Sequence, residues 1–400
     1  MNPKDTLNQL KLKTQDIVSE DELIKKIEKA QKENRPLKVK LGIDASGPDI
    51  HLGFAVVLRK LRQFQDLGHT AVLIVGDFTG KIGDPSGRSK ARPQLTDEQV
   101  KTNVERYKEQ IFQILSPQRA EFRFNSEWSD PLTGRDLIGI ASKYTLARII
   151  EREDFAQRLK QGFPIYMHEI LYHLFQGYDS IAVKADIELG GADQYWNLLV
   201  GRELQREFGQ EPQVIMTMPL LEGTDGKLKM SKSYNNYIGI AEPPNEIYGK
   251  TMSIPDSMIV KYFQLTTNYI ESEVKEVERR LKAGENPKNL KSLLAKEIVK
   301  MYYSADSAET AEKEFEKIFK HKSVPTEIDE FILKEKKINL TELLVKTKLL
   351  PSKTEARRKI AEGAVYIDDE RQAEPNFEII VDGPIILKVG KRKFLKIIPG

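Results

Sequence analysis

Residues 37–75 read LKVKLGIDASGPDIHLGFAVVLRKLRQFQDLGHTAVLIV, and this stretch decides the fold. Its opening residues predict a strand, and apolar residues then recur at helical spacing from Ile50 to Leu67. Gly68 is well placed to end that helix. Residues 71–75 form a continuous apolar run of the kind found in buried parallel strands. A strand, a helix and a second strand in this order are the core of a doubly wound α/β sheet.

The alternation of helices and strands continues beyond this core. Helices are expected at 96–115, 144–160, 168–177 and 191–208, and strands at 180–184 and 213–216. From about residue 243 the pattern becomes helical and highly charged, until a charged segment with Pro325 that suits a linker. We therefore expect a Rossmann-like domain with a doubly wound parallel sheet, a helical domain and a small C-terminal α/β domain, over 1–235, 236–325 and 338–400.

Composition narrows the class of protein. The chain has 400 residues, a formal net charge of +3 and 31% charged residues, which is typical of a soluble protein of two or three domains. The absence of cysteine excludes disulfides, thiolate metal sites and cysteine nucleophiles. No apolar run reaches the length of a membrane span, and the first residues lack a secretory signal, so we expect a cytoplasmic protein with no membrane partner. His168 and His173 lack the spacing of a helical zinc site, and no metal site is expected.

The first motif with chemical content lies at the start of the helix that follows the first strand, where His51 and Gly53 stand. A helix N-terminus attracts anions, and a histidine there can donate to a phosphate. Gly53 has no Cβ, so a nucleotide can approach the backbone. The alternative is a helix that happens to begin with histidine, and for the motif alone this is the better interpretation.

The second motif, Lys229-Met-Ser-Lys232-Ser, lies in a loop that also carries Gly223 and Gly226. Two ammonium groups on a glycine-rich loop suit a triphosphate, because they can stabilise its charge as the transition state forms. The alternative for such lysines is a solvated basic loop.

In this order, the two motifs resemble the paired signatures of class I aminoacyl-tRNA synthetases. Residues 77–88, 172–179 and 190–194 extend the resemblance to bacterial-type tyrosyl-tRNA synthetases with an intact Lys-Met-Ser-Lys-Ser loop, and it covers essentially all 400 residues. The resemblance implies an aminoacyl-tRNA ligase that activates L-tyrosine with ATP and transfers it to tRNA(Tyr). It implies Mg²⁺ bound with ATP at no dedicated protein site, and a homodimer joined through the catalytic domain.

The resemblance also assigns residues to each substrate. The implied ATP-binding residues are Asp44, His51, Gly53, Gly191, Asp193, Lys229 and Lys232, of which His51, Lys229 and Lys232 act in catalysis. The implied tyrosine-binding residues are Asp84, Tyr172, Gln176, Asp179 and Gln194. By resemblance, Asp84 holds the substrate ammonium and Asp179 accepts from the phenol, roles that suit a carboxylate. For residues 172, 176 and 179 an ordinary helix face is the alternative, and their spacing does not separate the two interpretations.

Three positions depart from the family pattern. Phe54 stands where the first signature usually ends in histidine, and a phenyl ring cannot hydrogen-bond a ribose. Ala192 replaces a commoner threonine or serine. Lys40 stands where another branch offers a second tyrosine to the phenol, so the second partner of the substrate hydroxyl stays open.

The C-terminal module, residues 338–400, carries basic residues on one predicted helix and one late strand. Its sequence resembles the S-four RNA-binding fold, and cationic side chains suit an RNA backbone. The candidate RNA-binding residues are Lys353, Arg357, Arg358, Lys391, Arg392 and Lys393. A solvated charged face is the alternative that charge alone would favour.

Two rival functions remain at this point. A tryptophanyl-tRNA synthetase shares the fold and both signatures, but Tyr172 and Asp179 argue against it. A non-catalytic RNA-binding homologue is favoured only by Phe54, and the two signature lysines argue against it.

Overall fold

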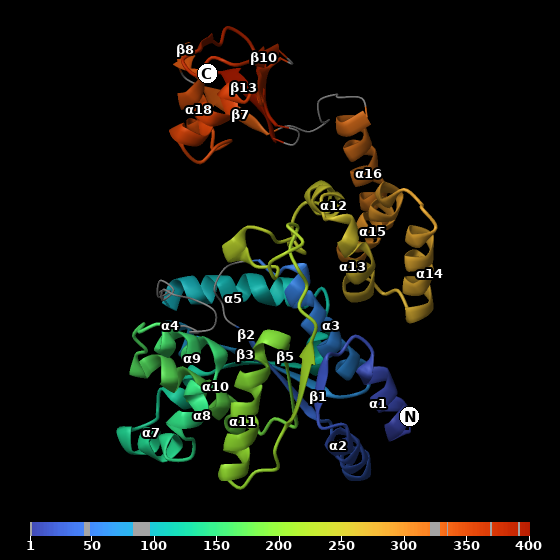
Figure 1. Cartoon of the computed structure of the whole chain (residues 1–400), viewed down its shortest axis with the longest axis vertical. Helices are drawn as coiled ribbons and strands as arrows, with labels where there is room; N and C mark the ends of the chain where they lie inside the picture. The colour runs from blue at the N-terminus through green and yellow to red at the C-terminus, as the bar shows by residue number, and fades with distance from the viewer. Residues whose placement is uncertain are drawn as a thin grey trace. The chain divides into compact units, whose positions relative to one another are not determined.

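The computed structural model describes residues 2–43, 49–82, 97–320, 329–333, 335–368, 370–390 and 393–400. The chain divides into two compact units, Met1–Ser304 and Ala305–Gly400 (Figure 1). The three-domain division expected from the sequence stays a prediction beside this two-unit one. Among the described residues, no helix is both long enough and apolar enough to cross a membrane.

The first unit is built on a six-stranded sheet. Its strands are β1 (Asp16–Val18), β2 (Lys38–Ile43), β3 (Thr70–Val75), β4 (Ala120–Phe124), β5 (Ile187–Gly191) and β6 (Val214–Met218). They lie in the order β1-β6-β5-β2-β3-β4, and all neighbours are parallel except β1 and β6. The chain leaves β2 in one direction and later returns to β5 on its other side. This reversal between β2 and β5 is the topological switch point, beside which doubly wound sheets bind ligands at the carboxyl ends of their strands.

Helices surround this sheet and continue beyond it (Figure 1). Those that precede β6 are α1 (Pro3–Lys11), α2 (Glu20–Glu33), α3 (Leu52–Asp66), α4 (Thr79–Ile82), α5 (Asp97–Ile111), α6 (Ser126–Ser129), α7 (Gly134–Ala141), α8 (Leu146–Ile150), α9 (Glu153–Lys160), α10 (Met167–Val183) and α11 (Tyr195–Glu207). Those that follow it in the first unit are α12 (Pro244–Met252), α13 (Ile259–Thr266), α14 (Glu271–Lys282) and α15 (Pro287–Tyr302). Short 3-10 turns lie at Pro117–Arg119, Ala192–Gln194, Lys232–Tyr234 and Asp256–Met258.

The predicted strand at 180–184 is wrong, because these residues complete the long helix α10. Leu174 and Ile181 lie two turns apart and join one buried cluster with Val200 and Leu204 of α11. A short apolar run cannot be assigned to a strand or a buried helix by periodicity alone. The strand itself comes later, as β5. The helix expected at 144–160 is likewise two helices, α8 and α9, and the helix expected at 191–208 begins only at Tyr195.

The second unit opens with α16 (Ala305–Lys320) and contains a five-stranded sheet of order β10-β9-β12-β13-β7 and a strand pair, β11-β8. The strands are β7 (Glu330–Leu333), β8 (Lys337–Asn339), β9 (Val365–Ile367), β10 (Glu370–Gln372), β11 (Glu378–Ile380), β12 (Ile385–Val389) and β13 (Lys393–Pro399). Two helices, α17 (Leu340–Lys346) and α18 (Lys353–Ala361), pack on a core of their own with Leu344, Ile360 and Leu387. The expected small α/β module is therefore present.

Candidate active site

Four of the candidate residues, Asp44, Asp84, Lys391 and Arg392, lie outside the described residues. The others can be placed, and those of the first unit gather at the carboxyl ends of β2 and β5.

His51 is the N-cap of α3, directly beyond β2, and its Nδ1 accepts a hydrogen bond from the Phe54 amide at 3.2 Å. Burial, together with the nearby Lys232 ammonium, lowers the pKa of His51 to about 4. The imidazole is therefore neutral at neutral pH. With Nδ1 accepting, the proton of the neutral ring sits on Nε2, which can donate to an anion at the helix N-terminus.

The Lys-Met-Ser-Lys-Ser loop docks on this helix end through Met230. The sulfur of Met230 accepts from the Gly53 amide at 3.4 Å, and the side chain is 5% exposed. A Cβ on Gly53 would lie 3.2 Å from Nδ1 of His51 and 3.4 Å from Cβ of Met230. A side chain at position 53 would therefore crowd the imidazole of His51 and come into contact with Met230.

The loop is shaped by a residue that the sequence reasoning missed. Asn236 is 4% exposed and donates to the Asp225 carboxylate and to the carbonyls of Leu228 and Lys229. Its Oδ1 accepts from the Ser231 amide at 2.9 Å. One buried amide thus fixes both sides of the lysine motif, while the lysine side chains stay outside this network.

Both signature lysines rest on protein partners. Nζ of Lys229 lies 2.5 Å from the carboxylate of Asp193, which follows β5. Nζ of Lys232 donates to the hydroxyl of Tyr107 on α5 at 2.8 Å and lies 5.0 Å from the centre of its ring. The structure therefore brings Asp193 and Lys229 together, as expected for two residues of one nucleotide site, and adds Tyr107.

Asp179 of α10 is buried, with 4% exposure, and its partners come from the corner after β4. The indole of Trp128 donates to Oδ1 at 2.8 Å, and Nδ2 of Asn125 lies 3.5 Å from Oδ2. Burial raises the pKa of Asp179 to about 7, against the opposing effects of the Lys40 charge and these two donors. Among the described residues, only the long contact of Asn125 reaches Oδ2, so this oxygen is the better acceptor for a further hydroxyl.

Of the remaining tyrosine candidates, two lie on the same helix and one follows β5. Tyr172 is 5% exposed and is in contact with the ring of His173. Oε1 of Gln176 is buried and has no hydrogen-bond partner among the described residues, which suits an acceptor for a substrate ammonium. Gln194, in the 3-10 turn after β5, accepts from Asn197 at 2.8 Å.

Lys40, whose role the sequence left open, is fully buried on β2. Its Nζ lies 2.8 Å from a carboxylate oxygen of Glu188 on β5. It also donates to Oγ of Ser180 at 2.7 Å and to the main-chain oxygen of Gln176 at 3.1 Å. Lysine at this position therefore joins β2 and β5 to α10. Its two contacts on α10 are residues that precede and follow Asp179 in sequence.

Comparison with known proteins shows the family. Residues 31–320 match the family model described as tRNA synthetases class I (W and Y), and residues 314–397 match that of the tyrosine–tRNA ligase SYY-like C-terminal domain. The tyrosine–tRNA ligase of Thermotoga maritima is 52% identical over 100% of this chain and 99% of that protein. That of Aquifex aeolicus is 48% identical over the full length of both.

The chain belongs to the class I tyrosyl-tRNA synthetase family.

Solved synthetases share the fold at lower identity. Tyrosyl-tRNA synthetase from Archaeoglobus fulgidus, complexed with L-tyrosine, is 22% identical with a TM-score of 0.63, covering 77% of this chain and 99% of that one. A truncated mitochondrial enzyme from Coccidioides posadasii is 21% identical with a TM-score of 0.61, covering 78% and 91%.

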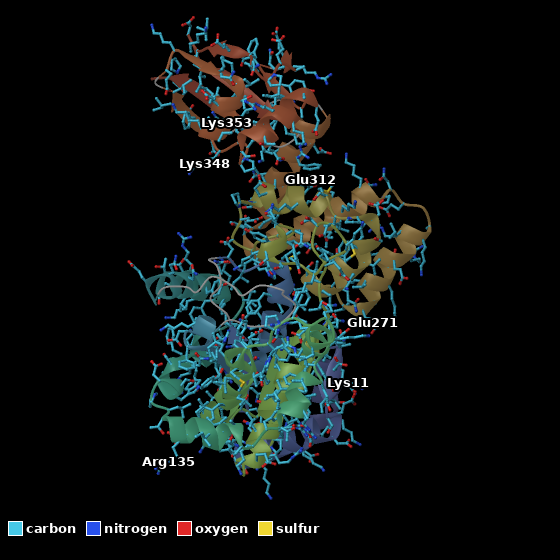
Figure 2. All side chains as sticks on the ribbon, turned by 60° about the vertical axis from the view of Figure 1, so that its left-hand side comes forward. Lys11, Arg135, Glu271, Glu312, Lys348 and Lys353 are labelled. Atoms are coloured by element: carbon cyan, nitrogen blue, oxygen red, sulfur yellow. The ribbon has the colours of Figure 1, made fainter. Side chains whose placement is uncertain are left out.

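In the second unit of the synthetase, three of the four candidate RNA-binding cations that the structure describes already have partners. Lys353, labelled in Figure 2, donates to Glu342 at 2.7 Å, and Arg358 donates to Glu355 at 2.9 Å. Lys393 donates to the main-chain oxygen of Leu349. Arg357 is exposed on α18 and has no hydrogen bond or ion pair with any described residue.

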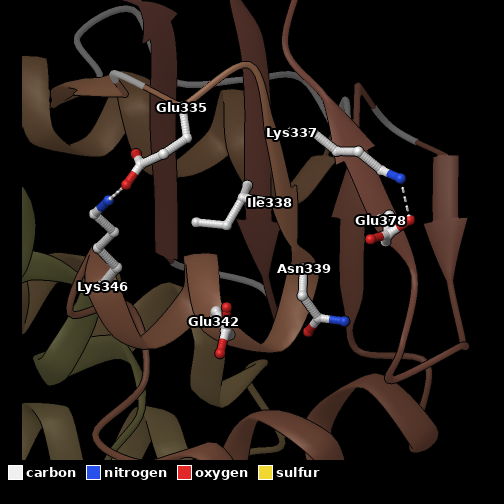
Figure 3. Close-up of a pocket in the computed structure, with 7 residues that line it drawn as sticks. All are labelled: Glu335, Lys337, Ile338, Asn339, Glu342, Lys346 and Glu378. Atoms are coloured by element: carbon white, nitrogen blue, oxygen red, sulfur yellow. Dashed lines mark hydrogen bonds and ion pairs between the residues drawn. The ribbon is translucent and has the colours of Figure 1, made fainter.

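An open pocket of the second unit (Figure 3) includes Glu342, which accepts from the candidate RNA-binding residue Lys353. It is lined by Glu335, Lys337, Ile338, Asn339, Glu342, Lys346 and Glu378. Lys337 pairs with Glu378, and Lys346 pairs with Glu335, so its charges are largely satisfied within the pocket.

Proposed function

We propose that the chain activates L-tyrosine with ATP and charges tRNA(Tyr). The substrate carboxylate attacks the α-phosphorus, which gives tyrosyl-adenylate and releases pyrophosphate. A hydroxyl of the terminal ribose of the tRNA then attacks the activated carbonyl and releases AMP. No protein side chain becomes a covalent nucleophile, so catalysis comes from positioning and charge stabilisation.

One observation carries the proposal: two chemically different groups of side chains lie next to the central strands β2 and β5. One combines the α3 N-terminus with the signature lysines, and the other surrounds Asp179. Their combination suits a triphosphate next to a phenol-bearing amino acid. The family membership of the full chain supports the same assignment.

The nucleotide roles are distributed as follows. His51 donates from Nε2 to phosphate oxygens at the N-terminus of α3, and Asp44 belongs to the same nucleotide site. Asp193 and the backbone at Gly191 hold the ribose. Glycine is required at position 191, because a Cβ there would lie 2.7 Å from the Asp193 carboxylate and displace it. The two lysines leave their resting partners and neutralise charge that builds up on the phosphates.

The amino-acid roles follow from burial and free acceptors. Asp179 accepts from the phenol hydroxyl, while Gln176 and Tyr172, with Asp84, hold the ammonium. Gln194 contacts the substrate carboxylate. Phenylalanine would leave the Asp179 acceptor buried and unpaired, and tyrosyl-tRNA synthetases are themselves the standard example of this means of rejection.

Mg²⁺ would enter with ATP. The described residues contain no group of three His, Asp or Glu that could hold a metal ion. The triphosphate oxygens would therefore supply most ligands of the ion, which is common for Mg²⁺ in nucleotide sites.

We further propose a homodimer formed through the catalytic domain. The support is a set of exposed apolar side chains on α7, α8, α9, the α9–α10 connection and the start of α10. Its members are Ile138, Leu146, Leu159, Phe163, Tyr166 and Met167, each more than half exposed. Exposed apolar side chains that gather on a surface mark protein interfaces. Light scattering across a concentration series measures the state directly, and a constant monomer mass would refute the dimer.

The second unit is proposed to bind the transfer RNA through α18 and β13. Transfer RNA charging supplies translation, so we place the enzyme in the cytoplasm.

Amino-acid-dependent exchange of pyrophosphate into ATP tests the function. We expect exchange with tyrosine and little with phenylalanine or tryptophan. Exchange driven by tryptophan would identify a tryptophanyl enzyme, and no exchange with any amino acid would identify a non-catalytic homologue.

A further inference from the structure

The tyrosine pocket contains a buried charged group that no step above uses. Lys40 is 0% exposed and Glu188 is 2% exposed, so neither charge is solvated. A lysine is rarely buried so completely unless its ammonium has a defined partner and a reason to be charged.

The surroundings of Lys40 tie it to the phenol end of the pocket. Its ammonium contacts the main-chain oxygen of Gln176 and the hydroxyl of Ser180, which flank Asp179 on α10. Ser180 in turn donates to Glu188 at 3.1 Å, and Nε2 of Gln213 donates to the same carboxylate. The polar groups of Lys40 and Glu188 are thus held in place by α10 and by Gln213, which precedes β6.

We propose that Lys40 is a positioning residue for tyrosine selection: it is the counter-charge that keeps the Asp179 carboxylate ionised and ready to accept from the substrate hydroxyl. This inference rests on the proposed function, in which Asp179 accepts from the phenol. It explains why lysine can stand where another branch has a tyrosine. The second contribution at the phenol end is then a charge behind the acceptor and not a second hydroxyl.

The charges around Asp179 determine whether each neighbour favours or opposes its ionised form. Among the described residues, Lys40 from β2 favours the ionised carboxylate, and Glu188 from β5 opposes it. Trp128 and Asn125 donate from the β4–α6 corner and also favour the charged form. Burial already brings the pKa of Asp179 to about 7, so loss of one neighbouring charge would change its ionisation near neutral pH.

The test uses variants with opposite expected effects. Lys40→Met removes the favourable charge, and Glu188→Gln removes the unfavourable one while its amide oxygen can still accept from Lys40. The pH dependence of kcat/KM for tyrosine in pyrophosphate exchange reports ionisation in the free enzyme. We expect the acid limb to move up by about 1 pH unit in Lys40→Met and down by a similar amount in Glu188→Gln.

A control separates the charge near Asp179 from the packing of a buried lysine. Lys26 of α2 is also buried, at 3% exposure, and pairs with Glu211, whose side chain is 50% exposed, in the segment before β6. Lys26→Met should lower stability without moving the pH profile.

The outcomes are distinct. Opposite displacements of the two profiles support the inference, and unchanged or parallel profiles overturn it. If Lys40→Met does not fold, the displacement in Glu188→Gln decides alone. Wild-type enzyme that shows no tyrosine-dependent exchange would instead refute the proposed function, independently of Lys40.

Discussion

The two ends of the proposed active site, one for the nucleotide and one for tyrosine, hold their charges in different ways. At the nucleotide end, Lys229 and Asp193 form an ion pair whose side chains are 46% and 30% exposed. At the tyrosine end, Lys40 and Glu188 form one whose side chains are 1% and 2% exposed. Solvent screens the first pair, so Lys229 can leave Asp193 for a ligand at little cost in free energy. The second pair has no such freedom, because a separated buried charge is expensive.

This contrast suits the two substrates. ATP changes its charge distribution during the reaction, and exposed lysines can follow it. The phenol of tyrosine does not react, so a rigid, preset acceptor serves selection better than a mobile one. The following predictions test whether this difference governs activity and stability.

The largest effect is expected at the buried end. Asp179→Ala should lower kcat/KM for tyrosine by more than about 10³-fold and narrow the gap to phenylalanine, a size taken from the known behaviour of this family. The reason is that the phenol would enter a buried site without its acceptor, while the donor groups of Trp128 and Asn125 would lose theirs. Pyrophosphate exchange with both amino acids measures it.

Trp128→Phe is the graded comparison, because it removes one donor to Asp179 and keeps the carboxylate. It should reduce tyrosine use less than Asp179→Ala does. Wild-type discrimination in Asp179→Ala would show that the phenol lies elsewhere.

The next largest effect is a difference in stability between variants of the two ion pairs. Lys40→Met leaves Glu188 buried without a counter-charge and should lower the free energy of unfolding by about 3 kcal/mol. Lys229→Met breaks an exposed pair and should cost less than about 1 kcal/mol. Urea denaturation measures both.

The double variant Lys40→Met/Glu188→Leu replaces both charges with apolar groups and should recover much of the loss. Equal losses in the two single variants would mean that burial does not distinguish these pairs.

The sequence predicted the nucleotide end better than the tyrosine end, for a physical reason. His51, Gly53 and Lys229 belong to short motifs whose local chemistry is visible in one stretch of chain. In the structure, Met230 contacts Gly53 and Lys229 contacts Asp193, while their roles in nucleotide binding stay a prediction.

The partners of Asp179 could not be found in this way. Trp128 is 51 residues away along the chain, and no local pattern marks it as a donor. Tyr107 and Asn236 are missed for the same reason, since their roles depend on tertiary contacts with the lysine loop. The same limit explains the wrong strand at 180–184, because an apolar run fits a buried helix as well as a strand.

At the nucleotide end, the lysines should act on the rate and not on tyrosine binding. Lys232→Ala should lower the single-turnover rate of adenylate formation by about 10²-fold, because it removes a charge that engages the phosphates in the transition state. The dissociation constant of tyrosine, from equilibrium titration, should stay unchanged.

Tyr107→Phe is the control, because it removes the hydroxyl on which Lys232 rests but keeps the ammonium. It should reduce the rate far less than Lys232→Ala. A normal rate in Lys232→Ala would exclude this loop from the chemistry.

The smallest effect is expected in the second unit, where exposure and pairing can be separated on one helix. Arg357 and Arg358 are both exposed on α18, but Arg358 already donates to Glu355, and Arg357 has no partner among the described residues. A guanidinium without an ion-pair partner is more available to a phosphate than a paired one, so Arg357→Ala should weaken binding of tRNA(Tyr) more than Arg358→Ala.

Loss of one phosphate contact reduces counterion release, so the slope of log affinity against log salt should fall by about 1 in Arg357→Ala. Titrations at several salt concentrations measure this, while tyrosine-dependent pyrophosphate exchange should be unaffected in both variants. Equal slopes in the wild type and both variants would show that α18 does not touch the RNA backbone, and would confine the role of exposed charges to the ATP site.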